Sequence, residues 1–251
     1  MTILYFSATG NCLSVAKKIG GELLSIPKLV KEGRYEITDD VIGVICPTYC
    51  ADAPKMVQNY LSKAKLTADY TFYISTFGYQ AGAAVSHGEE YLTKAAGHAD
   101  YVAKIIMVDT ALTRFETQKQ IDNLPKKDVE GQIERICVDI KERKKQITKV
   151  SAFDKVVDWL YHTAGKAQIA DDRDKGFIVT DACIKCGTCA KICPADNIKV
   201  TNHVEYLHRC EGCLGCLHNC PKNAIHLKNE QSAVRFRNPD VKIKELIDAN
   251  N

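Results

Sequence analysis

Residues 183–194 read C-I-K-C-G-T-C-A-K-I-C-P, and residues 210–221 read C-E-G-C-L-G-C-L-H-N-C-P. The two runs share the pattern C-x2-C-x2-C-x3-C-P, and the second repeats the first at an offset of 27 residues. The flanks keep this offset, since Ile198 falls on Ile225. Eight of the 12 cysteines lie in these runs, so the stretch is an internal repeat rather than an accident of composition.

The spacing of these cysteines indicates a metal centre built from thiolates. Structural zinc sites use four ligands, commonly arranged as two separated C-x2-C pairs. Here each run carries three closely spaced cysteines and a fourth that is followed by proline. That arrangement resembles the bacterial ferredoxins, which hold two [4Fe-4S] clusters. We therefore expect two cubane clusters in a small ferredoxin domain rather than two zinc ions.

The resemblance also implies how the cysteines are shared between the clusters. In ferredoxins of this kind, the fourth cysteine of each run binds the cluster of the other run. The expected ligands of the first cluster, called cluster I, are Cys183, Cys186, Cys189 and Cys220. The expected ligands of the second, called cluster II, are Cys193, Cys210, Cys213 and Cys216.

The chain has 251 residues and a formal net charge of +3. Each oxidised cluster with its four thiolates adds roughly −2, which brings the loaded protein to about −1. The charge therefore gives no reason to expect nucleic acid as a partner. The N-terminal sequence favours a strand over a signal peptide, and no apolar run approaches the length of a membrane span. Because thiolate clusters suit a reducing compartment, we expect a cytoplasmic protein.

Upstream of the repeat, short apolar runs alternate with helical patterns. Strands are expected at 3–6, 41–45, 70–76 and 101–108. Helices are expected from Cys12 to Leu23, over 55–64, up to Ala96, and from Val129 to Ile147. This alternation predicts an α/β fold, a doubly wound parallel sheet with helices on both faces. Ligands bind such folds beyond the carboxyl ends of the strands.

The loop after the first expected strand reads S-A-T-G-N-C at residues 7–12. A polar loop with a glycine, placed between a strand and a helix, aims backbone N–H groups and the positive helix end at one point, which suits a phosphate. The alternative is an ordinary loop whose hydroxyl and amide side chains cap the helix.

This loop resembles the phosphate loop of the flavodoxins, and the resemblance extends over residues 1–150. It implies a flavodoxin-like FMN-binding domain whose phosphate site is formed by Ser7, Thr9, Gly10, Asn11 and Cys12. The two sides of the flavin ring are then flanked by Pro47, Thr48 and Tyr49 and by Thr76, Phe77 and Gly78. The family usually has Thr or Ser at the position of Cys12. This chain therefore offers the phosphate one hydroxyl donor fewer.

Other residues near these loops leave two interpretations open. Asp109 and Arg114 either contact the flavin or a substrate, or they are solvated loop residues. Cys50 is either a redox thiol or a small buried hydrophobe. His208 and His218 lie within the cluster region, and we expect them at the surface.

The remaining segments complete the domain organisation. Residues 151–176 are expected to form a helical linker that docks the two domains, with an apolar stripe and with Trp159 in packing. The ferredoxin domain is expected over 177–237, beginning with a strand at 177–180. Residues 238–251 are expected to form a polar C-terminal tail with a short helix.

As a whole, the chain resembles the flavodoxin–ferredoxin fusion proteins of anaerobic bacteria. The resemblance implies an electron-transfer flavoprotein that links one-electron steps at the clusters to two-electron steps at FMN, with redox proteins as donor and acceptor. The alternative is an FMN-dependent reductase of a small molecule, fed by the clusters. For the reductase alternative, the long connection at residues 109–127 is a candidate lid over the substrate.

Overall fold

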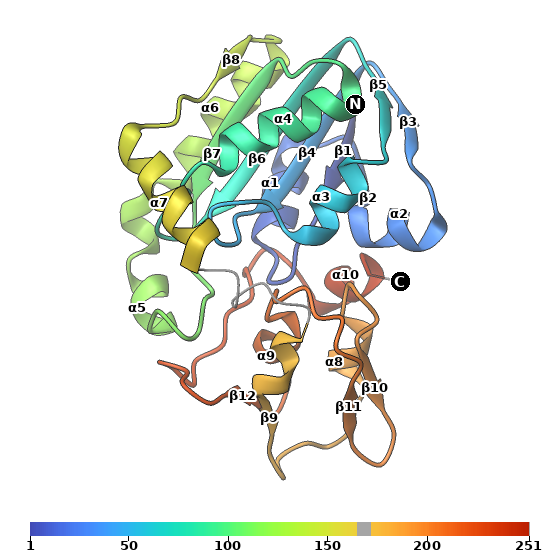
Figure 1. The fold of residues 1–251 in the computed structure, drawn as a ribbon, viewed down its shortest axis with the longest axis vertical. Helices are drawn as coiled ribbons and strands as arrows, with labels where there is room; N and C mark the ends of the chain where they lie inside the picture. The colour runs from blue at the N-terminus through green and yellow to red at the C-terminus, as the bar shows by residue number, and fades with distance from the viewer. Residues whose placement is uncertain (165–171, 251) are drawn as a thin grey trace.

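The computed structural model describes residues 1–164 and 172–250. Its larger domain is built on a six-stranded parallel sheet in the order β2-β1-β4-β6-β7-β8 (Figure 1). These strands are β1 (Thr2–Tyr5), β2 (Glu22–Ser25), β4 (Val41–Pro47), β6 (Tyr70–Phe77), β7 (Tyr101–Ile106) and β8 (Gln146–Ile147). A separate parallel pair is formed by β3 (Glu36–Thr38) and β5 (Lys65–Thr67). The order of the first five sheet strands is that of a flavodoxin-like fold, and β8 adds an edge strand.

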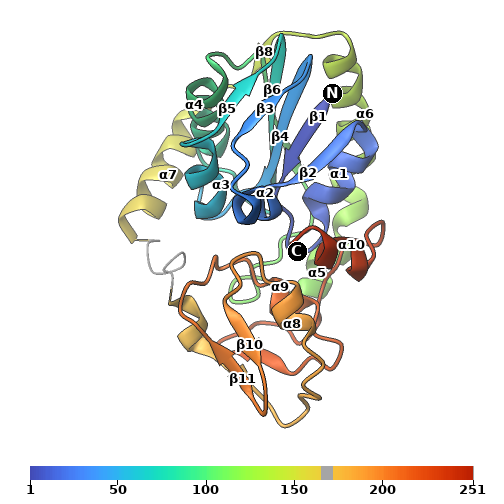
Figure 2. The ribbon, with the colours of Figure 1, turned by 90° about the vertical axis from the view of Figure 1, so that its right-hand side faces the viewer.

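Helices cover both faces of this sheet (Figure 2). On one face lie α1 (Asn11–Ile19) and α6 (Val129–Lys141). On the other lie α2 (Ile26–Glu32), α3 (Lys55–Leu61) and α4 (Ala84–Ala96). Within β1, Ile3 and Tyr5 pack on the first face and Leu4 on the second, as the two-residue period of a strand requires. The central strands β1, β4 and β6 are buried along nearly their whole length and are mostly apolar because helices cover both faces, which confirms the predicted α/β class.

The smaller domain repeats its own structure. Its elements are β9 (Phe177–Val179), α8 (Thr188–Lys191), β10 (Ile198–Val200), β11 (Val204–Tyr206), α9 (Gly215–His218) and β12 (Ile225–Leu227). The elements β9, α8 and β10 recur 27 residues later as β11, α9 and β12. The two antiparallel pairs, β10 with β11 and β12 with β9, are equivalent under the same offset. The sequence repeat is therefore a repeat of the backbone.

Left-handed backbone positions follow the repeat as well. Positive φ angles occur at the equivalent pairs Lys185 and Gly212, Gly187 and Leu214, and Asp196 and Asn223. A left-handed backbone conformation is costly for residues with a Cβ. Because non-glycine residues adopt it at equivalent positions of both runs, the loop structure must impose this conformation on the backbone.

The C-terminal segment differs from the predicted polar tail. Its helix, α10 (Ile243–Asp248), follows Val241, and both Val241 and Leu246 are buried in the core of the α/β domain beside α1. The backbone N–H of Asn238 donates to the carbonyl of Thr9 at 2.8 Å. The segment therefore crosses back from the small domain and packs on the larger one. Its few apolar residues are diluted by charged neighbours, which hid this role in the sequence.

Two helix ends also differ from the predictions. The first helix ends at Ile19, because Gly20 and Gly21 adopt positive φ, and Leu23 lies in β2. The helix expected to reach Ile147 ends at Lys141. Arg143 there has a φ of 51°, and the N–H of Lys144 donates to the carbonyl of Asp139 at 2.9 Å. This is the bonding of a Schellman C-cap, and it frees the chain to form β8.

The predicted linker contains α7 (Ala152–Ala164), but its apolar stripe does not pack. Phe153 is 68% exposed and Trp159 is 64% exposed, so the packing expected for Trp159 is wrong. The helix instead turns Asp154 inward, where its carboxylate accepts bonds from Gln80 and Ser151. Polar contacts with the α/β domain therefore set the orientation of α7.

The long connection expected at 109–127 is partly helical. It contains α5 (Thr117–Asp122) and the 3-10 helix η1 (Leu124–Lys127). A further 3-10 helix, η3 (Arg173–Gly176), precedes β9. None of the helices in the described residues has the length and apolar character needed to span a membrane.

Candidate functional site

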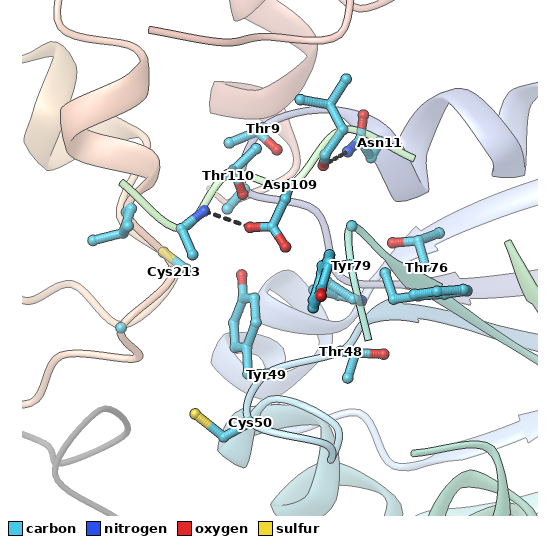
Figure 3. A pocket seen from close by; sticks show the side chains of 18 of the residues that line it. Thr9, Asn11, Thr48, Tyr49, Cys50, Thr76, Tyr79, Asp109, Thr110 and Cys213 are labelled. Carbon is cyan, nitrogen blue, oxygen red and sulfur yellow. Dashed lines mark hydrogen bonds between the residues drawn. The ribbon is translucent and has the colours of Figure 1, made fainter. Parts of the chain in front are cut away.

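A cavity lies between the carboxyl edge of the large sheet and the small domain (Figure 3). Its lining comes from the loops after β1, β4, β6 and β7, from Tyr161 of α7, from Arg173 of η3, and from residues 212–214 of the second cysteine run. We call it the edge cavity. It lies where ligands bind in doubly wound sheets, and here a second domain forms one of its walls.

The structure brings together nearly all of the residues predicted for FMN. The edge cavity is lined by Ser7, Thr9, Asn11, Cys12, Pro47, Thr48, Tyr49, Thr76, Phe77 and Gly78. Gly10 is the exception among the predicted residues. It has a φ of 96°, and a Cβ at this position would lie 3.0 Å from Asn238 and 3.0 Å from Val241. Its lack of a side chain lets the C-terminal segment pack on the loop.

Asn11, at the start of α1, uses its side chain within the protein. Its amide Nδ2 donates to the carbonyl of Val108 at 3.2 Å, and its Oδ1 accepts from Asn238 at 3.2 Å. This side chain ties the first loop to the end of β7 and to the C-terminal segment. The group that Asn11 offers an anion is therefore its backbone N–H, in the first turn of α1, where the N–H groups lack helical partners.

Cys12 crosses between two of the loops. Its Sγ lies 3.1 Å from Oγ1 of Thr76, and the side chain is buried. Burial raises the pKa of the Cys12 thiol to about 12, against the smaller opposing effect of the Thr76 hydrogen bond. The thiol is therefore neutral at ordinary pH and links the first loop to the end of β6.

The loop after β4 makes a tight turn at the cavity wall. Tyr49 and Asp52 exchange two backbone hydrogen bonds of 2.7 and 3.1 Å, and the central residues Cys50 and Ala51 both have positive φ. Asp52 fixes the turn because its carboxylate accepts from the hydroxyl of Tyr91 at 3.0 Å and from its neighbour's N–H. The turn therefore presents Tyr49 and Cys50 to the cavity in a constrained backbone.

Tyr49 stands between this loop and the second cysteine run. Its ring packs edge-on to Phe6, with centroids 6.3 Å apart, and it shares a hydrophobic cluster with Cys213. Burial, and next the neighbouring Cys213 thiol, raise the pKa of the Tyr49 phenol well above its usual value. Figure 3 shows the hydroxyl of Tyr49 directed toward the part of the cavity where Cys213 and Asp109 lie.

Asp109 and Arg114, whose roles the sequence left open, both line the edge cavity. Asp109 accepts the N–H of Ala111 at 2.8 Å, and burial raises the pKa of its carboxyl despite the opposing effects of Lys127 and Arg114. The guanidinium of Arg114 stacks on the ring of Tyr161, 5.1 Å from the centroid, and donates to its hydroxyl. Tyr161 and Arg173 are cavity residues that the sequence did not indicate, because the linker that carries them has no recognisable motif.

The cysteines of the two runs gather into two groups of four. Burial raises the pKa of the Cys189 thiol to about 11, with smaller contributions from Cys183, Cys186 and Cys220. Those four thiols also line a second cavity, which we call the cysteine cavity. Burial likewise raises the pKa of Cys216, with contributions from Cys213, Cys193 and Cys210, and last from Cys189 of the first group. In each group, three residues come from one run and the fourth from the other.

These two groups match the sets implied by the ferredoxin resemblance, so the residues present fit two cubane clusters. Backbone N–H groups already point at the sulfurs. Asn197 donates to Cys193 and Ala224 donates to Cys220, each at 3.3 Å, and these two bonds are equivalent under the repeat. Within the residues that the structure describes, no three His, Cys, Asp or Glu side chains gather to hold a single metal ion.

The two histidines of the cluster region lie in different surroundings. His208 is at the surface, as predicted, and its Nδ1 lies 2.7 Å from Oδ1 of Asp174. His218 is only 4% exposed, so its predicted surface position is wrong. Its Nε2–H donates to the carbonyl of Thr110 and its Nδ1 accepts from Phe236, while burial lowers its pKa to about 4. The neutral ring thus joins α9 to the loop after β7.

Comparison with protein families found a match for one segment of the chain. Residues 177–199 match the 4Fe-4S binding domain family. No curated protein matches the sequence.

Among solved structures, a Fusobacterium nucleatum flavodoxin bound to flavin mononucleotide is 14% identical, covers 57% of this chain and 98% of its own, with a TM-score of 0.36. A Lactobacillus acidophilus flavoprotein in complex with FMN is 16% identical, covering 49% of this chain and 97% of its own, with a TM-score of 0.31. The two-electron reduced flavodoxin of Megasphaera elsdenii is 17% identical. The match covers 42% of this chain and 83% of that flavodoxin, with a TM-score of 0.32.

The strand order and the helical layers define the fold class. Taken with the 4Fe-4S match of residues 177–199, they show a flavodoxin-like α/β domain joined to a small domain that carries a 4Fe-4S binding segment.

Proposed function

We propose that this protein is a cytoplasmic electron carrier of anaerobic metabolism that passes electrons between two [4Fe-4S] clusters and a bound FMN. The clusters would supply one-electron chemistry, and the flavin would exchange either one or two electrons. Redox proteins would act as donor and acceptor. The observation that carries the proposal is the position of Cys213, an expected cluster ligand, in the wall of the same cavity as the expected FMN loops.

The residues assigned to the flavin divide into a phosphate end and a ring end. Ser7, Thr9 and the N-terminus of α1 would hold the phosphate, since Thr9 and the first-turn N–H groups lie at the cavity wall. Thr48 and Tyr49 would flank one side of the ring, and Thr76 to Gly78 the other. Lys127 supports the second side because its ammonium donates to the carbonyls of Gly78, at 2.9 Å, and of Met107.

The chain's role toward cluster II is to bring it close to the flavin and to exclude water. Leu214 is 4% exposed and Leu217 is fully buried beside the expected ligands. Asn219 follows α9, and its amide donates to the carbonyl of Ala8 in the phosphate loop at 3.2 Å. This bond fixes the cluster-binding helix against the loop expected to hold FMN, so the two cofactors would keep a constant separation.

Anaerobic purification followed by iron, sulfide and flavin analysis tests the proposal. We expect about eight iron atoms and eight sulfides per FMN. Partial reduction of the clusters should then be followed by electron movement to the flavin, observed by absorbance and by electron paramagnetic resonance. Zinc in place of iron, or a flavin that exchanges no electrons with the clusters, would contradict the proposal.

A second candidate is an FMN-dependent reductase of a small molecule. It is favoured by Asp109, Arg114 and Tyr161, three polar residues of the edge cavity that are not assigned to FMN. Asp109 is a candidate proton donor, since burial raises the pKa of its carboxyl. Multiple turnover of a quinone, a nitro compound or an enone would support the reductase, and oxidation by protein acceptors alone would support the carrier.

A further inference from the structure

The cysteine cavity opens at the surface of the small domain. Cys186 is exposed, and the neighbouring Ile184 is 58% exposed. Both line this cavity together with the other expected ligands of cluster I. An exposed ligand and an exposed apolar side chain beside it make this the part of the cluster region that another protein can approach.

Lysines surround this opening. Lys185 and Lys222 are exposed and line the cavity. Lys191 is also exposed, and it ends α8, two positions after Cys189. Among the described residues that line the cavity, none is acidic. The nearest acidic residues in the sequence are Glu205, which follows the lining residue Val204, and Asp181, two positions before Cys183.

The equivalent surface of the second run cannot serve the same purpose. Glu211 and Gly212 occupy the positions of Ile184 and Lys185 under the repeat. Glu211 accepts the N–H of Met56 at 3.1 Å, and the carbonyl of Gly212 accepts from Arg173 at 3.3 Å. This loop is therefore held against the rest of the protein, and only the first run presents an apolar residue with lysines around it.

The charges around the opening favour a partner with negative surface charge. A cluster with four thiolates carries a net negative charge, so it would repel an acidic protein that approached it unaided. The ammonium groups of Lys185 and Lys222 at the opening, with Lys191 on the adjoining helix α8, offset that repulsion and attract negative surface charge, while Ile184 supplies an apolar centre.

We propose that the face formed by Ile184, Lys185, Lys191 and Lys222 docks a small acidic iron–sulfur electron carrier. This inference rests on the proposed function. In the transfer step, one electron leaves the reduced cluster of the carrier and enters cluster I. The carrier is thereby oxidised by one electron and cluster I is reduced by one, and no bond or proton moves.

The test measures binding of an acidic bacterial 2[4Fe-4S] ferredoxin to the purified protein by titration calorimetry at several salt concentrations. The variant Lys185→Glu/Lys222→Glu should bind about 10-fold more weakly at low salt and lose most of the salt dependence. The control Lys94→Glu/Lys141→Glu makes the same charge change on α4 and α6 of the α/β domain and should bind like the wild type. Flavin reduction by photoreduced 5-deazariboflavin, a small reductant, should be equal in all three proteins.

Equal affinity of the ferredoxin for the wild type and for Lys185→Glu/Lys222→Glu would overturn the docking face, while iron content and internal electron transfer would still support the proposed function. Equal weakening in the control variant would also overturn it, because attraction to the net charge would then be the cause. Binding of the wild type to anionic phospholipid vesicles but not to the ferredoxin would assign the face to membranes instead. Absence of iron from all three proteins would overturn both proposals.

Discussion

The loop that carries Cys183 and Cys186 lies at the protein surface, whereas the equivalent loop with Cys210 and Cys213 lies against the α/β domain. The two loops have the same cysteine spacing, and left-handed backbone occurs at equivalent positions in both. One lines the cysteine cavity, and the other reaches the edge cavity beside Tyr49. A single duplicated backbone thus faces two different surroundings.

The difference resides in the residues between the cysteines. Ile184 corresponds to Glu211, Lys185 to Gly212, and Gly187 to Leu214. In the second run, the carboxylate of Glu211 bonds to the larger domain, the carbonyl of Gly212 accepts from Arg173 of η3, and Leu214 is buried. The cysteine pattern therefore sets what each loop binds, and the intervening residues set whether it faces solvent or the flavodoxin-like domain.

The largest difference between the two loops is expected when one cysteine in each is replaced. Cys186→Ser and Cys213→Ser should each lose about four iron atoms, because each removes a ligand of one cluster. In Cys186→Ser the remaining cluster is the one beside the edge cavity, so electrons placed on it should still move to the flavin. In Cys213→Ser the remaining cluster is the remote one, and transfer should be far slower.

Flash photoreduction followed by absorbance at flavin and cluster wavelengths measures this internal transfer. The wild type sets the rate for both clusters together. Equal rates in the two serine variants would show that proximity to the edge cavity does not decide the path.

A smaller effect is expected from the residues that hold the second loop in place. Glu211→Ala removes a charged acceptor from the N–H of Met56 and should lower the free energy of unfolding by about 1.5–3 kcal/mol. Ile184→Ala, at the equivalent position, removes a side chain that is 58% exposed. This variant should change the free energy of unfolding by no more than about 0.5 kcal/mol. Anaerobic urea denaturation of the loaded proteins measures both, and equal losses would mean that the two loops are equally anchored.

Local features of this molecule were predictable because they depend on short-range patterns. The apolar runs at β1, β4, β6 and β7 specify buried parallel strands, and the loop from Ser7 to Cys12 specifies the start of α1. The carboxyl ends of these strands meet at one edge, so the candidate FMN residues were brought together as expected, apart from Gly10.

Features that depend on contacts between distant segments were not predictable. The burial of Leu246 and of His218 comes from packing between the two domains, which no local pattern specifies. Tyr161 of α7 and Arg173 of η3 line the edge cavity although no local motif marks either residue. The exposure of Trp159 is a similar case, since the polar partners of Asp154 determine which side of α7 faces inward.

The smallest expected effects concern the backbone that the two loops share. Gly187 has a φ of 74°, and a Cβ there would meet no atom within 4 Å, so Gly187→Ala tests conformation alone and should cost about 1 kcal/mol. Lys185 has a φ of 55° where its equivalent is Gly212, so Lys185→Gly should stabilise the fold by up to about 1 kcal/mol.

Lys185→Ala is the matched control for Lys185→Gly, because it removes the same charge and keeps a Cβ in the left-handed position. The difference in urea midpoint between these two variants therefore measures the backbone contribution. If Lys185→Gly is no more stable than Lys185→Ala, the bound cluster holds this loop in the left-handed conformation without cost. In that case the shared backbone of the two runs is imposed by the metal centre more than by the glycines.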